Sequence, residues 1–235
     1  SKAVTAMDQV TQANSAHAMG NATLKDKAPA QAREPLQLAV RAFSTLHSQD
    51  PDNRTWAFGL IRAESALLRS DAKTSHVATA QRLSQRLSAL EVGRRPSVRL
   101  HPLRTELALL SAQALSANGD FPGARRVLHD TLAIVGPDAV ASKSDLKLVQ
   151  AELDLELGLI RLAGQSKEER RLSCQAIEQR LSNPHLRPLV LVHEGLTQAW
   201  LLAQQCLGNE QEANKIRHWL EIQRLLPAAP LSSTP

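Results

Sequence analysis

Apolar residues recur every three or four positions along most of this chain, which is the spacing of one face of an α-helix. After residue 50, for example, Trp56, Leu60, Ala63 and Leu67 follow one another at steps of four, three and four residues. Similar stripes predict helices over residues 56–67, 77–90, 103–115, 124–135, 146–160, 172–181, 189–203 and 213–226. No segment alternates apolar and polar residues with the β-branched enrichment of a strand, so the sequence predicts an all-α fold.

Prolines and glycines divide these helices into pairs. Five prolines stand at the ends of apolar stretches, at intervals of 45, 41, 47 and 43 residues: Pro51, Pro96, Pro137, Pro184 and Pro227. Three glycines, Gly119, Gly164 and Gly208, lie between paired helical segments at intervals of 45 and 44 residues. Both sets give a period of about 44 residues, which is typical of an α-solenoid of stacked helix–turn–helix units. We expect about five such units.

The first 50 residues carry a weaker pattern. Apolar residues mark one helix near the start and a second near the end of this segment: Val4, Met7 and Val10, then Ala39, Ala42, Phe43 and Leu46. The polar stretch from Gly20 to Arg33 is expected to form a long loop between them. We therefore predict a capping hairpin over residues 1–51, a repeat array over residues 52–227 and a disordered tail over residues 228–235.

The turn Ser116-Ala117-Asn118-Gly119-Asp120-Phe121, with Ala124, Leu128 and Gly136-Pro137 after it, resembles the tetratricopeptide repeat. In that family a Gly-Asp-aromatic turn joins two helices, a small residue lies early in the second helix, and a proline closes the unit. The fifth unit repeats the spacing in Leu207-Gly208-Asn209, Ala213 and Pro227. The fourth has Glu169 where the small residue belongs, and the second has Ser70-Asp71 in place of the glycine.

This resemblance covers residues 52–227 and is most specific over residues 107–137. It implies a right-handed α-solenoid, and the period is similar to that of longer tetratricopeptide variants, including those in bacterial signalling proteins. HEAT-like or unclassified helical repeats are the alternative, because the tryptophan and tyrosine typical of the first tetratricopeptide helix are largely missing.

Stacked hairpins curve, and the first helix of each unit lines the inner face of the curve. Aligning the units on the third one places a mixed, amide-rich set of side chains there, suited to hydrogen bonding with a peptide backbone. These candidate partner-binding residues are Glu64, Glu106, Gln113, Asp154, Arg161, Gln198 and Gln205.

The chain lacks the usual catalytic motifs. Neither a Gly-x-Ser-x-Gly nucleophile turn nor a phosphate-binding Gly-x-x-x-x-Gly-Lys-Ser/Thr loop occurs. The eight histidines include no i, i+4 pair that would start a metal site. We therefore expect no catalytic residue, metal or cofactor, and an enzyme would require a deep pocket with convergent titratable groups.

The charge and the cysteine content of the chain limit which classes of partner and which cellular compartment we expect. The net charge is +5, but three Phe, three Trp and no Tyr offer few stacking surfaces, which disfavours a nucleic-acid partner. No apolar run reaches the ~18 residues of a membrane span, so we expect no membrane insertion within this chain. Two well-separated cysteines, Cys174 and Cys206, favour reduced thiols in the cytoplasm. A disulfide between neighbouring helices, and with it the periplasm, is the alternative.

These observations favour a non-catalytic scaffold that binds a protein or peptide, as the interaction part of a larger bacterial protein or complex. The alternative is a ligand- or peptide-sensing domain attached to a signalling effector, such as a kinase or a transcription regulator.

Overall fold

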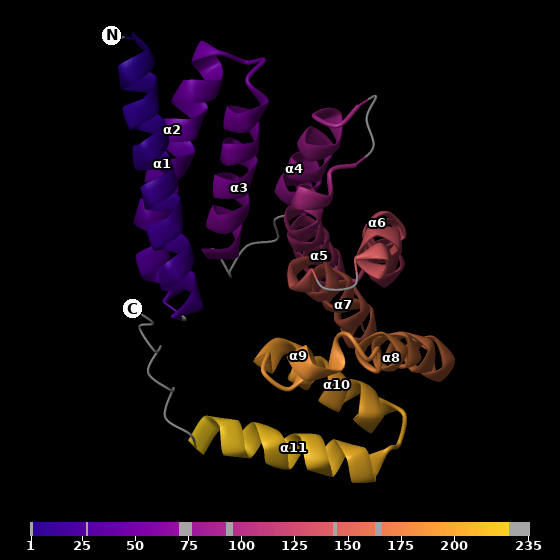
Figure 1. Cartoon of the computed structure of the whole chain (residues 1–235). Helices are drawn as coiled ribbons and strands as arrows, with labels where there is room; N and C mark the ends of the chain where they lie inside the picture. Colours follow the sequence, from indigo (N-terminus) through magenta and orange to yellow (C-terminus); the bar gives the residue numbers. More distant parts are fainter. Residues whose placement is uncertain are drawn as a thin grey trace. The chain divides into compact units, whose positions relative to one another are not determined.

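The structure is a computed structural model, which describes residues 2–26, 28–70, 77–92, 96–142, 145–162 and 166–225. All regular structure in these residues is helical, which confirms the predicted all-α class. Its helices are α1 (Lys2–Lys25), α2 (Pro29–Gln49), α3 (Arg54–Ser70), α4 (Val77–Ala89), the 3-10 turn η1 (Val98–Leu100), α5 (His101–Ala117), α6 (Phe121–Ala141), α7 (Leu146–Arg161), α8 (Lys167–Leu181), α9 (Arg187–Val190), α10 (Glu194–Cys206) and α11 (Glu210–Leu225) (Figure 1). Within the described residues no helix is both long and apolar enough to cross a membrane.

The chain divides into two compact units, Ser1–Val127 and Leu128–Pro235, called unit 1 and unit 2 below. In unit 1 each helix from α1 to α4 packs on the next one (Figure 1). In addition α1 contacts α3, and α3 contacts α5. Leu60 and Ala63 of α3 are buried against Phe43 and Leu46 of α2, and further along the unit Ile61 is buried with Leu83, Leu87 and Leu107. The helices are thus paired in chain order, with successive first helices of each pair also in contact.

Unit 2 has the same order of contacts. Helix α7 packs on α8, α8 on α10 and α10 on α11, while α7 also contacts α10 (Figure 1). One core of buried side chains joins these helices, with Val149 and Leu153 of α7, Ile177 of α8, Trp200 of α10 and Ile216 of α11 among its members. Each hairpin has a first helix, and these first helices are α1, α3, α5, α7 and α10.

Two turns, one in each unit, have the same geometry. Gly119 and Gly208 have φ of 81° and 77°, the left-handed region that favours glycine. In both turns the residue after the glycine donates its N–H to a carbonyl five residues back: Asp120 to Leu115 and Asn209 to Gln204. Such hydrogen bonds satisfy carbonyls that the helix end leaves free. The two turns are 208 − 119 = 89 residues apart, two of the predicted periods.

The small residues predicted after these turns are also in place. Ala124 of α6 and Ala213 of α11 are both completely buried. An alanine lets a second helix approach closely, because its side chain adds little beyond the backbone.

The N-terminal hairpin forms, but the predicted long loop from Gly20 to Arg33 is wrong. Helix α1 continues to Lys25 and α2 starts at Pro29. This stretch contains several alanines, whose helix propensity is high, and Ala32 is buried in the contact between the two helices. The apolar stripe was also misjudged, since Met7 is exposed.

Other predicted boundaries differ as well. Pro137 was predicted to end its unit, yet it lies inside α6, which continues to Ala141. The predicted helix over residues 189–203 is divided into the short α9 and α10, with Val192 exposed between them. Asp71, Gly164, Pro227 and the tail over residues 228–235 lie outside the described residues.

Candidate binding groove

A groove of about 370 Å³ runs along two first helices of unit 2, α7 and α10. Its lining combines amide and charged side chains with aliphatic ones. The lining residues are Gln150, Asp154, Leu157 and Arg161 of α7, and Gly195, Gln198, Ala199, Leu201, Leu202 and Gln205 of α10. Four of the seven sequence-predicted site residues, Asp154, Arg161, Gln198 and Gln205, therefore share one surface.

The helix directions explain why residues one period apart meet. Helix α8 runs against α7, because Arg180 near the end of α8 pairs with Glu152 near the start of α7. Helices α7 and α10 start side by side, since a Cβ on Gly195 would lie 3.2 Å from Gln150 Oε1. Asp154 and Gln198 are 198 − 154 = 44 residues apart, and both line the groove.

Asp154 is the most unusual group of the groove. Its side chain is half-buried and accepts one hydrogen bond, from Gln150 Nε2 at 2.7 Å. It has no ion pair with any other described residue. Burial raises the pKa of Asp154, and the Gln150 hydrogen bond and the charge of Arg161 offset this only in part. The groove therefore holds a carboxylate that the protein itself does not fully compensate.

The other polar groups of the groove are open to solvent. The side chains of Arg161 and Gln205 are exposed and make no hydrogen bond or ion pair within the described part of the chain. Gln198 is exposed too, and its amide donates to Glu194 Oε1 at 2.8 Å on the same helix. These side chains can be rearranged around a ligand at little cost, because few contacts hold them.

In unit 1 the predicted residue Glu106 is held by internal contacts. Glu106 of α5 accepts from Ser65 Oγ of α3 at 2.5 Å and pairs with Arg69 Nε of α3 at 3.0 Å. Arg69 also donates to Asn21 Oδ1 of α1 at 2.7 Å. Asn21 Nδ2 in turn lies 3.0 Å from His17 Nε2. These five residues form a polar network across α1, α3 and α5, called the unit 1 network below.

His17 is at the end of this network. Burial lowers the pKa of His17, and the positive charges of Arg62 and Arg69 lower it further. A neutral imidazole has one nitrogen that can accept a hydrogen bond, which suits the Asn21 amide beside it.

The remaining predicted residues of unit 1 are Glu64 and Gln113. Glu64 Oε2 accepts from Arg86 Nη1 of α4 at 2.6 Å, so it joins the two helices of one hairpin. Gln113 is exposed on α5 and makes no side-chain hydrogen bond with the other described residues. A partner-binding role of Glu64, Glu106 and Gln113 stays a prediction.

On the side of α7 away from the groove, a largely buried ion pair joins α7 to α8. Arg180 of α8 pairs with Glu152 Oε2 at 2.9 Å and donates to the carbonyl oxygens of Ala139 and Ser142. Burial raises the pKa of Glu152, against the lowering effect of Arg180. Burial also raises the pKa of Glu156, which is hydrogen bonded to Ser173. Within the described residues no three His, Cys, Asp or Glu side chains gather as a metal site.

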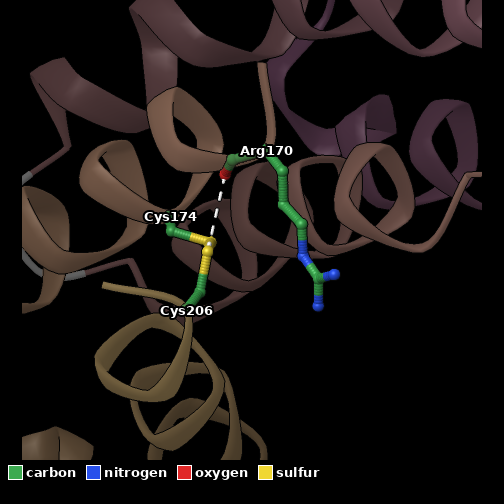
Figure 2. Close-up of a disulfide and its surroundings, with 3 residues drawn as sticks. All are labelled: Arg170, Cys174 and Cys206. Carbon is green, nitrogen blue, oxygen red and sulfur yellow. Dashed lines mark hydrogen bonds between the residues drawn. A yellow bond between two sulfur atoms is a disulfide. The ribbon is translucent and has the colours of Figure 1, made fainter. Parts of the chain in front are cut away.

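The two cysteines are joined, so the predicted reduced thiols are wrong. A disulfide links Cys174 of α8 to Cys206 at the end of α10, across a sequence separation of 32 residues. The sulfur of Cys206 lies 3.7 Å from the carbonyl oxygen of Arg170, and Figure 2 shows the disulfide beside this residue. The bond holds the end of α10 to α8, next to the groove residue Gln205.

The chain matches no protein-family model, no curated protein and no solved structure. The tetratricopeptide resemblance therefore stays a prediction. A function must be argued from the groove itself.

Sequence reasoning missed six of the groove's lining residues, including Ala199, which it assigned to an apolar stripe. Gln150 could have been found, because it lies one helical turn before Asp154 on the same face. Gly195 lies 195 − 150 = 45 residues after Gln150, one period further, and so carried the same signal. Leu157, Leu201 and Leu202 were assigned to the core or left unassigned, because periodicity does not separate a groove floor from a helix contact.

Proposed function

We propose that this protein is a non-catalytic binding module that holds a peptide segment of another protein in the groove between α7 and α10. The observation that carries the proposal is the shared lining by residues one period apart, Asp154 with Gln198 and Arg161 with Gln205. Exposed amides along an aliphatic floor can bind the backbone of an extended chain. In this proposal the hairpins within each unit stack as they do in a right-handed, tetratricopeptide-like solenoid.

The disulfide supports a proposal about the compartment. A bond between Cys174 and Cys206 persists in oxidising surroundings and is rare in the bacterial cytoplasm. We infer that the protein works in the periplasm or outside the cell, and not in the cytoplasm as first expected. Its role there is to recruit a partner for a larger protein or complex.

A displayed library of random twelve-residue peptides tests the binding function. The intact chain should enrich a family of peptides with one-to-one binding. The double variant Gln198→Ala/Gln205→Ala should weaken binding of the enriched peptides about thirtyfold, since each of the two lost hydrogen bonds accounts for about 1 kcal/mol. Both glutamines are exposed, so the fold should be unaffected.

Gln12→Ala is the matched control, because it removes an exposed glutamine from α1, a first helix of unit 1, outside the groove and outside the predicted site residues. It should leave the affinity of the enriched peptides unchanged. If no peptide is enriched, or if the double variant binds as tightly as the original chain, the groove is not a peptide site.

A further inference from the structure

The two charges of the groove lie at a defined spacing. Asp154 and Arg161 are seven residues apart on α7 and line the same groove. At ~1.5 Å rise per residue, their positions are separated by about 10 Å along the helix axis. Leu157 lies between them on that face, roughly one turn from each.

Each charge lacks a contacting partner of opposite sign within the described residues. Asp154 accepts only the Gln150 amide. Arg161 is exposed at the other end. Elsewhere on α7 a buried acid does have such a partner, as Glu152 has Arg180. A ligand with a cation for Asp154 and an anion for Arg161 would complete both contacts, since charge-assisted hydrogen bonds are the strong ones.

Peptide geometry limits which ligands carry two such charges at this distance. In a polyproline II helix residues i and i+3 lie on the same side, about 9 Å apart. In a β-strand the same-side residues i and i+2 are only about 7 Å apart. The groove spacing therefore favours the polyproline II conformation over a β-strand.

We propose that the groove recognises a polyproline II segment of a partner protein with the pattern Lys/Arg-x-x-Asp/Glu. The basic side chain binds Asp154, its aliphatic stem lies on Leu157 and Leu202, and the acidic side chain binds Arg161. Gln198 and Gln205 bind the peptide backbone between these positions. This inference rests on the proposed peptide-binding function and names its ligand class.

Four blocked synthetic peptides test the pattern by calorimetric titration of the intact, disulfide-bonded chain. The first is Pro-Lys-Pro-Pro-Glu-Pro, and the second replaces its Lys with Gln. The third, Pro-Lys-Pro-Glu-Pro-Pro, shortens the spacing. The fourth is a helix-forming peptide with Lys and Glu seven residues apart. The first should bind about tenfold more tightly than each of the others.

Variants of the protein locate the two contacts. Asp154→Asn should lower affinity for the first peptide about tenfold and leave affinity for the Gln-containing peptide unchanged. Arg161→Gln should lower affinity for the first peptide as well. Asp130→Asn is the matched control, because Asp130 is an exposed carboxylate of α6 outside the groove.

The outcomes separate this inference from the proposed function. Tight binding of library peptides that is insensitive to Asp154→Asn and to the Lys-to-Gln exchange would overturn the ligand class but leave the groove as a peptide site. A preference for the helical peptide would also overturn the polyproline II pattern. If neither the library nor the synthetic peptides bind, both proposals fail.

Discussion

The first helices of unit 1 and unit 2 use similar polar residues in opposite ways. In unit 1 the facing side chains of α3 and α5 bind one another, with Glu106 held by Ser65 and Arg69. In unit 2 the corresponding side chains of α7 and α10 line an open groove, where Asp154 has one hydrogen bond and Arg161 none among the described residues. Polar side chains at corresponding positions thus bind one another in unit 1, whereas in unit 2 they line an open groove.

The difference shows what a repeat period can and cannot predict. The period determines which side chains of successive first helices come close together. Whether those side chains pair depends on the charges that happen to meet, such as Arg69 with Glu106 in unit 1. In unit 2 Gln198 is the residue one period after Asp154, and an amide cannot neutralise a carboxylate.

Loss of the disulfide should have the largest effect on stability, and this effect should be confined to unit 2. The variant Cys174→Ala/Cys206→Ala removes a link across 32 residues, which should lower the free energy of unfolding by about 3–4 kcal/mol. Urea unfolding measures the loss. Hydrogen exchange followed by mass spectrometry should place the loss in α8 and α10, with α1 to α3 unchanged.

Reduction of the original chain should produce the same loss of stability. An equal loss of protection in α1 to α3 would contradict the comparison, because it would mean that the units unfold together.

Truncation in the unit 1 network should have a smaller effect. Glu106→Ala leaves Ser65 and Arg69 without their acceptor and should cost about 1 kcal/mol, a modest value because the ion pair is partly exposed. Peptide affinity should stay unchanged, since Glu106 is committed to internal contacts. Thermal unfolding and peptide titration on the same samples measure both effects.

Glu106→Gln is the matched control, because it keeps an acceptor oxygen for Ser65. It should recover part of the stability lost in the alanine variant. Weaker peptide binding by Glu106→Ala would show instead that the network belongs to the binding surface.

Much of the fold could be predicted from the sequence because helix periodicity and turn glycines are local signals. Gly119 and Gly208 correctly identified two joints, and their φ values show why a glycine stands there. The four groove residues Asp154, Arg161, Gln198 and Gln205 were found by counting one period along the chain.

What the sequence left out depends on contacts between distant residues. The pairing of Arg69 with Asn21 and Glu106 joins three helices, and no local pattern indicates it. The disulfide likewise required knowing that the end of α10 lies against α8. One missed signal was local: Ser166 and Glu169 form a capping box at the start of α8, which explains the glutamate found where a small residue was expected.

The smallest expected effect runs opposite to the others, because Asp154→Asn should make the protein more stable at neutral pH. Burial raises the pKa of Asp154, so the folded state binds its proton more tightly than the unfolded state does. Stability contributed by this group therefore increases as the pH falls through the interval between the raised and the ordinary pKa, and it stays at its lowest, constant value at any pH above that interval. An asparagine keeps the hydrogen bond from Gln150 without the buried charge, which should add less than about 1 kcal/mol at pH 7.

The pH dependence of stability tests whether the gain in Asp154→Asn comes from the buried charge. Glu152 and Glu156, whose pKa values burial also raises, should add stability as the pH falls from 7 towards the ordinary carboxyl pKa, whereas His17, whose pKa burial lowers, should remove stability on acidification. The charged group that acts on Asp154 is Arg161 on the same helix, and its positive charge lowers the pKa of Asp154 against the effect of burial. The stability gained by Asp154→Asn over the original chain, measured by thermal unfolding, should therefore shrink as the pH falls, whereas Asp130→Asn should follow the original chain at each pH. A loss of stability in Asp154→Asn would mean that this carboxylate supports the fold. If the carboxylate instead binds a ligand, Asp154→Asn should gain stability and lose affinity for the peptide.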